Sequence, residues 1–206
     1  MPADTGQDFI AAMAGVAATT SPWEVAAVLL AVIYLLLAIR EHPGCWPAAI
    51  LSSLIYVVLL GEQQLYMEAA LQVFYVAMAV YGWWAWRPAA EGGALVVHVW
   101  PWRWHAGALL LVGLLSLASG RLLATNTAAA LPYLDSSITW ASLLATWMVA
   151  RKVLENWLYW FAIDSLSLGV FLSRGLYLTA VLFAVYLVLI VIGYRRWRGQ
   201  LLKNRQ

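Results

Sequence analysis

Charged side chains are scarce in this sequence, and their scarcity excludes most classes of soluble protein. Only 11% of the 206 residues are charged, 64% are hydrophobic, and the mean hydropathy is +0.79. Soluble domains average about 25% charged and about 45–50% apolar residues. We therefore expect an integral membrane protein that is surrounded by the lipid bilayer.

Residues that carry catalysis or bind metals are also few. Cys45 is the only cysteine, which excludes an internal disulfide and a zinc site built on paired cysteines. The three histidines are dispersed without an HExxH spacing, and no GxxxxGKS/T loop for nucleotide phosphates is present. We therefore expect no enzyme, no metal, no cofactor and no nucleic-acid partner. No basic segment precedes an apolar one at the N-terminus, so we expect no removable signal peptide.

Long apolar runs are abundant. A helix that crosses a bilayer needs about 17–25 apolar residues, and seven runs come close to this length. We place the spans at residues 23–39, 45–60, 65–84, 105–124, 135–150, 153–172 and 176–194. An eighth apolar piece, at residues 8–18, is too short to cross and predicts a surface or capping helix.

The basic residues lie almost entirely on one side of these spans. Ten of the 12 lysines and arginines follow odd-numbered spans or lie at the C-terminus, and only Arg121 and Arg174 fall on the other side. Loops rich in lysine and arginine stay in the cytoplasm. The sequence therefore predicts an N-terminus outside the cell and a C-terminus in the cytoplasm.

The first half of the chain is weakly repeated in the second half, at a fixed offset of 111 residues. Eleven of the 48 positions from Arg40 to Arg87 are identical to those found 111 residues later. The identical pairs include Trp46 and Trp157, Tyr75 and Tyr186, Gly82 and Gly193, and Trp86 and Trp197. In a membrane protein, such repeats favour a transporter, because transporters place their binding site at the interface between repeats.

The repeat and the charge pattern together predict the architecture. Spans 1–3 and 5–7 form two three-helix units, and the single span between them gives both units the same orientation. The expected fold is an all-α membrane protein with seven transmembrane helices in a 3+1+3 arrangement of parallel repeats, as in SWEET transporters. The expected segments are 1–22 (extracytoplasmic), 23–87 (repeat 1), 88–124 (loop and linker helix), 125–198 (loop and repeat 2) and 199–206 (cytoplasmic basic tail).

Polar side chains inside these spans are candidates for a binding site, because such groups are costly in hydrocarbon and usually face a cavity. Helical spacing places Asn156, Trp160 and Asp164 on one face of span 6, flanked by Trp157. Gln72 and Tyr75 share a face of span 3. The remaining candidates are Ser52 and Tyr56 in span 2 and Trp140 in span 5.

Two interpretations of these residues remain open. Aromatic rings and amides in a cavity can hold an aromatic ligand, and the Asp164 carboxylate can offset a positive charge on it. Alternatively, serine and amide side chains simply hydrogen-bond neighbouring helices, as is common in membrane bundles. The repeat favours the first interpretation where its copies differ, because Gln72 corresponds to Phe183 and Ser53 corresponds to Asp164.

Most of the 13 tryptophans lie near predicted span ends, where aromatic residues form interfacial belts. We assign to such belts Trp23, Trp46, Trp83, Trp84, Trp86, Trp100, Trp102, Trp104 and Trp197.

Three longer motifs resemble the PnuC-type vitamin transporter family. They are LQVFY at residues 71–75, YGWWAW at 81–86 and RKVLENWLYW at 151–160, and the likeness extends over about residues 23–198. The resemblance implies a multi-pass protein of the bacterial inner membrane that takes up a vitamin precursor, most often nicotinamide riboside, by facilitated diffusion. A cytoplasmic kinase then traps the small-molecule substrate. By motif position, the resemblance implies substrate contacts at Gln72, Asn156, Trp157 and Trp160.

This chain departs from the family pattern at two positions. Some nicotinamide riboside transporters have an amide where this chain has Asp164, and another where it has Ser52. A carboxylate suits both nicotinamide riboside and thiamine, which are cations, better than riboflavin. Thiamine uptake, a receptor that binds without transporting, and assembly as a homo-oligomer stay open as alternatives.

Overall fold

The computed structural model describes residues 21–62, 66–87, 95–127, 130–173, 175 and 177–204, and the surface or capping helix expected at residues 8–18 lies outside them. The described part of the chain is all-helical, as the composition predicts, and contains seven helices. They are α2 (Pro22–Ile39), α3 (Cys45–Glu62), α4 (Tyr66–Ala85), α5 (Trp102–Asn126), α6 (Pro132–Ala150), α7 (Asn156–Ser173) and α8 (Tyr177–Lys203).

Four of these helices are long and apolar enough to cross a membrane, judged by length and composition. They are α2, α3, α5 and the part of α8 from Thr179 to Lys203. α8 begins close to the expected residue but continues well beyond residue 194. The residues expected to start a separate basic tail at 199 are therefore the last turn of this helix.

The start of α7 differs from the prediction by three residues. α7 begins at Asn156 rather than at residue 153, because Val153 forms a parallel β-bridge with His98. The His98 N–H donates to the carbonyl of Lys152 (3.1 Å), and the Leu154 N–H donates to the carbonyl of His98 (2.8 Å). These two bonds hold the segment before α5 against the turn between α6 and α7.

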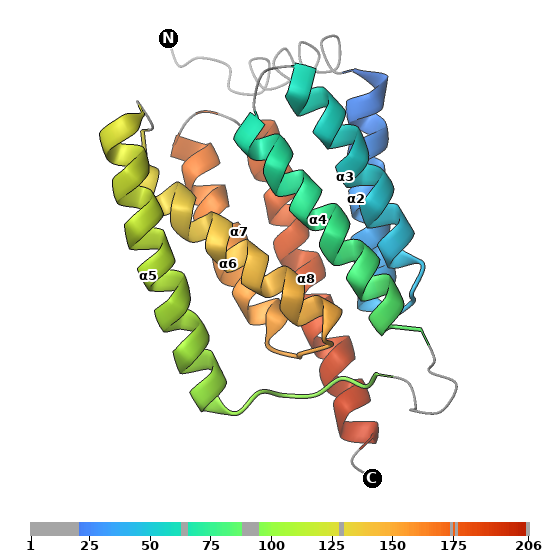
Figure 1. Ribbon diagram of the computed structural model, residues 1–206. Coiled ribbons are helices and arrows are strands. Elements are labelled where there is room, and N and C mark those ends of the chain that lie inside the picture. The colour runs from blue at the N-terminus through green and yellow to red at the C-terminus, as the bar shows by residue number, and fades with distance from the viewer. Residues whose placement is uncertain are drawn as a thin grey trace, which may run out of the picture.

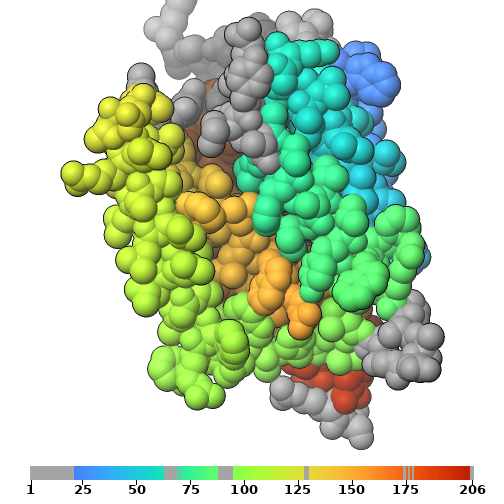
Figure 2. All heavy atoms as spheres, in the orientation of Figure 1, coloured from blue at the N-terminus to red at the C-terminus, as the bar shows by residue number. Residues whose placement is uncertain are grey.

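Six of the helices form a ring of neighbours, and α5 lies outside it (Figure 1). α2 packs against α3, α3 against α4, α4 against α6, α6 against α7, α7 against α8, and α8 against α2. α5 packs on the outside of α6. On the face shown in Figure 2, the side chains of α6 lie between those of α5 and α4. The first three helices and the last three therefore meet at two seams, α4–α6 and α2–α8.

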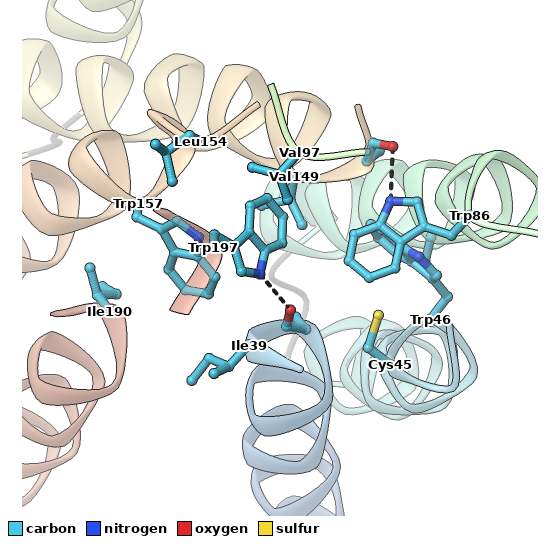
Figure 3. Close-up of a cluster of buried hydrophobic side chains, with 13 residues drawn as sticks. Ile39, Cys45, Trp46, Trp86, Val97, Val149, Leu154, Trp157, Ile190 and Trp197 are labelled. Atoms are coloured by element: carbon cyan, nitrogen blue, oxygen red, sulfur yellow. Dashed lines mark hydrogen bonds between the residues drawn. The ribbon is translucent and has the colours of Figure 1, made fainter. Parts of the chain in front are cut away.

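A cluster of four indoles fills the core at the end of the ring where α2 and α6 stop (Figure 3). This tryptophan cluster consists of Trp46, Trp86, Trp157 and Trp197, each at most 5% exposed. The Trp46 and Trp86 rings meet edge to face with centroids 5.1 Å apart, and those of Trp157 and Trp197 do so at 5.4 Å. The assignment of Trp46, Trp86 and Trp197 to interfacial belts is therefore wrong, because these rings pack inside the bundle.

The tryptophan cluster also joins the two seams. The indole N–H of Trp86 on the α4 side donates to the carbonyl of Ala150 at the end of α6 (3.0 Å). The indole N–H of Trp197 on α8 donates to the carbonyl of Ala38 at the end of α2 (3.1 Å). Figure 3 shows both bonds. Each half of the chain thus caps a helix end of the other half.

Glycine is required where two helices approach these rings. A Cβ atom at Gly82 would overlap the ring of Trp46, and one at Gly193 would overlap the ring of Trp157. Both glycines and both tryptophans are identical pairs of the 111-residue repeat. The repeated residues of this region therefore perform the same packing task in both halves.

Candidate substrate-binding site

Asp164 lies near the middle of α7 and is only 6% exposed. It interacts electrostatically with two tyrosines, Tyr75 on α4 and Tyr186 on α8. These tyrosines are the same position of the repeat, 111 residues apart. A buried carboxylate from the second half therefore lies within electrostatic range of two equivalent tyrosines, one from each half of the chain.

Two more polar side chains extend this group. Ser142 of α6 lies close to the Tyr75 hydroxyl, and Tyr56 of α3 lies near Tyr186. We call Tyr56, Tyr75, Ser142, Asp164 and Tyr186 the central cluster. Its members come from five of the six ring helices, so the central cluster lies within the ring and not on its outer surface.

The Asp164 carboxylate has no counter-charge in the part of the chain that the structure describes. The ion pair found there joins Lys152 to Glu41 (3.0 Å), and a ring nitrogen of His105 lies 3.9 Å from the Glu155 carboxylate. Burying a carboxylate without a partner is costly. Such a group inside a membrane protein is by default a candidate for contact with substrate or ions.

Asn156 and Trp157 lie eight and seven residues before Asp164, toward the tryptophan cluster. Both are almost fully buried. The Asn156 amide donates to the carbonyl of Val153 (2.6 Å), but its oxygen has no partner among the described residues, and neither has the indole N–H of Trp157. Buried polar atoms are nearly always hydrogen-bonded. The Asn156 oxygen is therefore available as an acceptor and the Trp157 indole N–H as a donor.

The other predicted residues occupy different surroundings. Trp160 is partly buried and packs against the core that contains the tryptophan cluster, and Gln72 is partly buried on α4. The Ser52 hydroxyl donates to the carbonyl of Ala27 on α2 (2.8 Å). The structure thus brings Tyr56, Tyr75 and Asp164 together in the central cluster, whereas Ser52 joins two helices.

Trp140 is directed to the helix outside the ring. Its indole N–H donates to the hydroxyl of Ser119 on α5 (3.1 Å). This bond fixes the indole at the seam between α5 and α6, where it helps to hold α5 against the ring.

Two members of the central cluster, Ser142 and Tyr186, are absent from the sequence-based set. For Tyr186 a signal exists in the sequence, since it is the repeat partner of Tyr75, which belongs to the predicted set. Ser142 carries no such signal, because its repeat partner would be Ala31 and a lone serine in a span is most often a helix contact.

Comparisons with known proteins agree on one family. The sequence profile described as nicotinamide mononucleotide transporter matches residues 21–199. The nicotinamide riboside transporter PnuC of Escherichia coli (strain K12) is 27% identical over 175 residues, which cover 70% of this chain and 73% of PnuC. The riboflavin/roseoflavin transporter RibM of Streptomyces davaonensis is 27% identical over 176 residues, covering 82% of this chain and 81% of RibM.

A solved structure has the same fold. A crystal structure of the vitamin B3 transporter PnuC superposes with a TM-score of 0.72, covering 94% of this chain and 88% of that one, at 17% sequence identity. The relatives are transporters and not enzymes, and the apolar helices are those of a multi-pass membrane protein. On the match over residues 21–199, this chain belongs to the nicotinamide mononucleotide transporter family.

Proposed function

We propose that this protein carries a cationic vitamin precursor, nicotinamide riboside, across the bacterial inner membrane by facilitated diffusion. The observation that carries the proposal is the buried, unpaired Asp164 carboxylate beside Tyr75 and Tyr186 in a member of this transporter family. The positive charge of the nicotinamide riboside ring is the counter-charge that Asp164 lacks. Two tyrosine rings add cation–π attraction of about 0.5–2 kcal/mol.

Hydrogen bonds to the carboxamide and ribose of the substrate would come from residues near the central cluster. Gln72 lies one turn before Tyr75 on α4, and Asn156 lies about two turns, or roughly 12 Å, before Asp164 on α7. The unused oxygen of Asn156 and the unused indole N–H of Trp157 are suited to the carboxamide of nicotinamide or to ribose hydroxyls. In this proposal Trp160 borders the same path, whereas Ser52 and Trp140 hold helices together.

The proposed architecture is two parallel three-helix repeats joined by α5, a 3+1+3 arrangement of seven transmembrane helices. Equivalent contacts in the two halves support it: both repeats pack a tryptophan on a glycine and send an indole N–H to a helix end of the other. Access would alternate when one repeat rocks against the other at the α4–α6 and α2–α8 seams. The tryptophan cluster is then the closed end of the path.

The excess of basic residues after odd-numbered spans supports a cytoplasmic location for the tryptophan cluster and the C-terminus. A uniporter only brings its substrate to electrochemical equilibrium, so sustained uptake needs a step that consumes the substrate inside. We propose that a cytoplasmic kinase phosphorylates the imported nucleoside. The added charge prevents the product from returning through a site that already holds a carboxylate.

Riboflavin uptake is the second candidate, because the match to RibM covers more of both chains than the match to PnuC does. Riboflavin is uncharged, so it would leave the Asp164 carboxylate without a counter-charge. Thiamine, as a cation, would satisfy the same carboxylate.

A binding titration of the purified protein in detergent separates these substrates. Nicotinamide riboside, thiamine and riboflavin are titrated in turn, and the dissociation constant of each is measured by calorimetry. The proposal expects the tightest binding for nicotinamide riboside and the weakest for riboflavin. Preference for riboflavin would contradict the assignment of a cationic substrate, and binding of none of the three would contradict the transport of vitamins.

A further inference from the structure

A groove of about 570 Å³ lies between α7 and α8, beside the tryptophan cluster. Its apolar walls include Leu158 and Phe161 of α7 and Val191 of α8, which are 53%, 45% and 39% exposed. The buried polar side chains Asn156 and Asp164 belong to the same α7 helix but do not line the groove. The groove is therefore separate from the central cluster and opens on the outer surface of the ring, where the bilayer lies.

Positive charge is concentrated on the α8 wall of this groove after Tyr194, with Leu202 beyond it. Arg195 and Arg198 line it together with Tyr194, and both arginines are exposed. Residues three apart lie on the same helix face, so the two guanidinium groups are neighbours. No carboxylate lines the groove, and neither arginine is in an ion pair within the described residues.

The chemistry of the groove fits an amphiphile with a negative head. From Val191 to Arg198, α8 rises about 10 Å. Over this length the lining of the groove changes from apolar side chains to guanidinium groups. Guanidinium groups bind phosphate through two parallel hydrogen bonds. A tyrosine beside them is typical of the level of lipid headgroups. The volume lies within the range of about 300–1,000 Å³ that is usual for ligand sites.

We infer that this groove is a binding site for one anionic phospholipid. The acyl chain lies along Leu158, Phe161 and Val191, and the phosphate lies between Arg195 and Arg198. Basic pockets between helices on the cytoplasmic side of membrane proteins take up such headgroups. Charge complementarity decides between lipids, because a zwitterionic headgroup brings its own cation to the same two arginines.

Two variants of this chain distinguish specific lipid binding in the groove from nonspecific attraction of anionic lipid to a basic helix. Arg196 is exposed on the same helix but does not line the groove, so Arg196→Gln removes an equal charge without touching the site. Gly199 lines the groove, and a Cβ atom there meets no heavy atom within 4 Å. Gly199→Leu therefore fills the groove while every arginine stays in place.

The experiment measures how many lipids stay bound to the full-length protein by native mass spectrometry after titration with phosphatidylglycerol or phosphatidylcholine. We expect the wild type and Arg196→Gln to retain one phosphatidylglycerol and to prefer it over phosphatidylcholine. Arg195→Gln with Arg198→Gln, and Gly199→Leu alone, are expected to weaken this binding about tenfold. Melting temperatures measured without lipid show whether each variant is folded.

Three outcomes would overturn the inference. If the wild type retained phosphatidylcholine as well as phosphatidylglycerol, the charge of the headgroup would have no role in binding. An equal loss in Arg196→Gln would reduce the effect to nonspecific attraction, and full binding by Gly199→Leu would move the lipid elsewhere. Inorganic phosphate that displaces the lipid at millimolar concentration would show an anion site without a role for the acyl chain.

Discussion

The side chains of Glu41 and Lys152 bind each other although they occupy the same position in the two halves of the chain. Their carboxylate oxygen and ammonium nitrogen are 3.0 Å apart, and the residues are 111 positions apart in the sequence. Both have a left-handed backbone, with φ of 55° and 53°, in the turns that end α2 and α6. The Lys152 ammonium also lies 4.8 Å from the centre of a Trp86 ring. The pair therefore ties the two repeats together beside the tryptophan cluster.

Removing the charge of Glu41 should destabilise this end of the bundle. The Lys152 side chain is 10% exposed, and in Glu41→Gln its ammonium loses its counter-charge. We expect a loss of about 1–3 kcal/mol, less than the ~3–5 kcal/mol of fully buried pairs, because Glu41 is 18% exposed. Thermal melting in detergent measures it. Arg40→Gln, on the neighbouring exposed residue, is the control, and an equal fall in its melting temperature would contradict a role for the pair.

The two packing glycines should respond alike. Gly82→Ala and Gly193→Ala each place a methyl group into a tryptophan ring, and such overpacking costs about 1–3 kcal/mol. Gly107→Ala and Gly113→Ala in α5 are matched controls, because a Cβ there meets no heavy atom within 4 Å. Alanine favours a helix over glycine by up to about 1 kcal/mol, so the controls should melt at the same or a higher temperature. Tolerance of alanine at Gly82 and Gly193 would contradict the packing described.

How far the sequence predicts this fold depends on which contacts are local. Lengths of apolar sequence predict the helices to within a few residues, because each span is set by its own composition, except that α8 continues well beyond residue 194. The start of α7 could not be predicted, since it depends on a β-bridge between Val153 and the distant His98. Trp46 and Trp86 lie near span ends, and only tertiary packing distinguishes a buried indole from one in an interfacial belt.

Replacing the central carboxylate should affect charged and neutral ligands differently. Asp164→Asn keeps the size of the side chain and removes its charge. We expect the dissociation constant of nicotinamide riboside to rise tenfold or more, which is about 1.4 kcal/mol or more, and that of riboflavin to stay unchanged. Calorimetric titration of both ligands checks this. An equal change for both ligands, or no change for either, would show that Asp164 does not recognise charge.

Two polar residues predicted from sequence as substrate contacts should separate into different roles. Gln72→Leu is expected to weaken nicotinamide riboside binding about tenfold, because a ligand group loses its hydrogen bond. Ser52→Ala should leave affinity unchanged and cost about 1 kcal/mol of stability, because its hydroxyl is already bonded to Ala27. Affinity and melting temperature are measured for both. Weaker binding by Ser52→Ala at unchanged stability would reverse the assignment.

The site was partly predictable for a physical reason. Asp164 is recognisable from sequence alone because an ionisable group in the middle of a span is expensive. Its neighbours are less recognisable, since tyrosine and serine are tolerated in a helix bundle with or without a ligand. Tyr186 belongs to the site because the two halves of the chain face each other, so that it lies near Asp164 as its repeat partner Tyr75 does. The sequence of a single span does not reveal this arrangement.

Uptake into proteoliposomes tests the central claim most directly. Radiolabelled nicotinamide riboside is added outside vesicles that contain the purified protein, with no ion gradient across the membrane. With the membrane potential held at zero by equal potassium on both sides and valinomycin, we predict saturable entry that stops when the inner and outer concentrations are equal, with slower entry at low substrate concentration for Asp164→Asn. Binding without entry, or accumulation above the outer concentration that requires a proton or sodium gradient, would contradict the account.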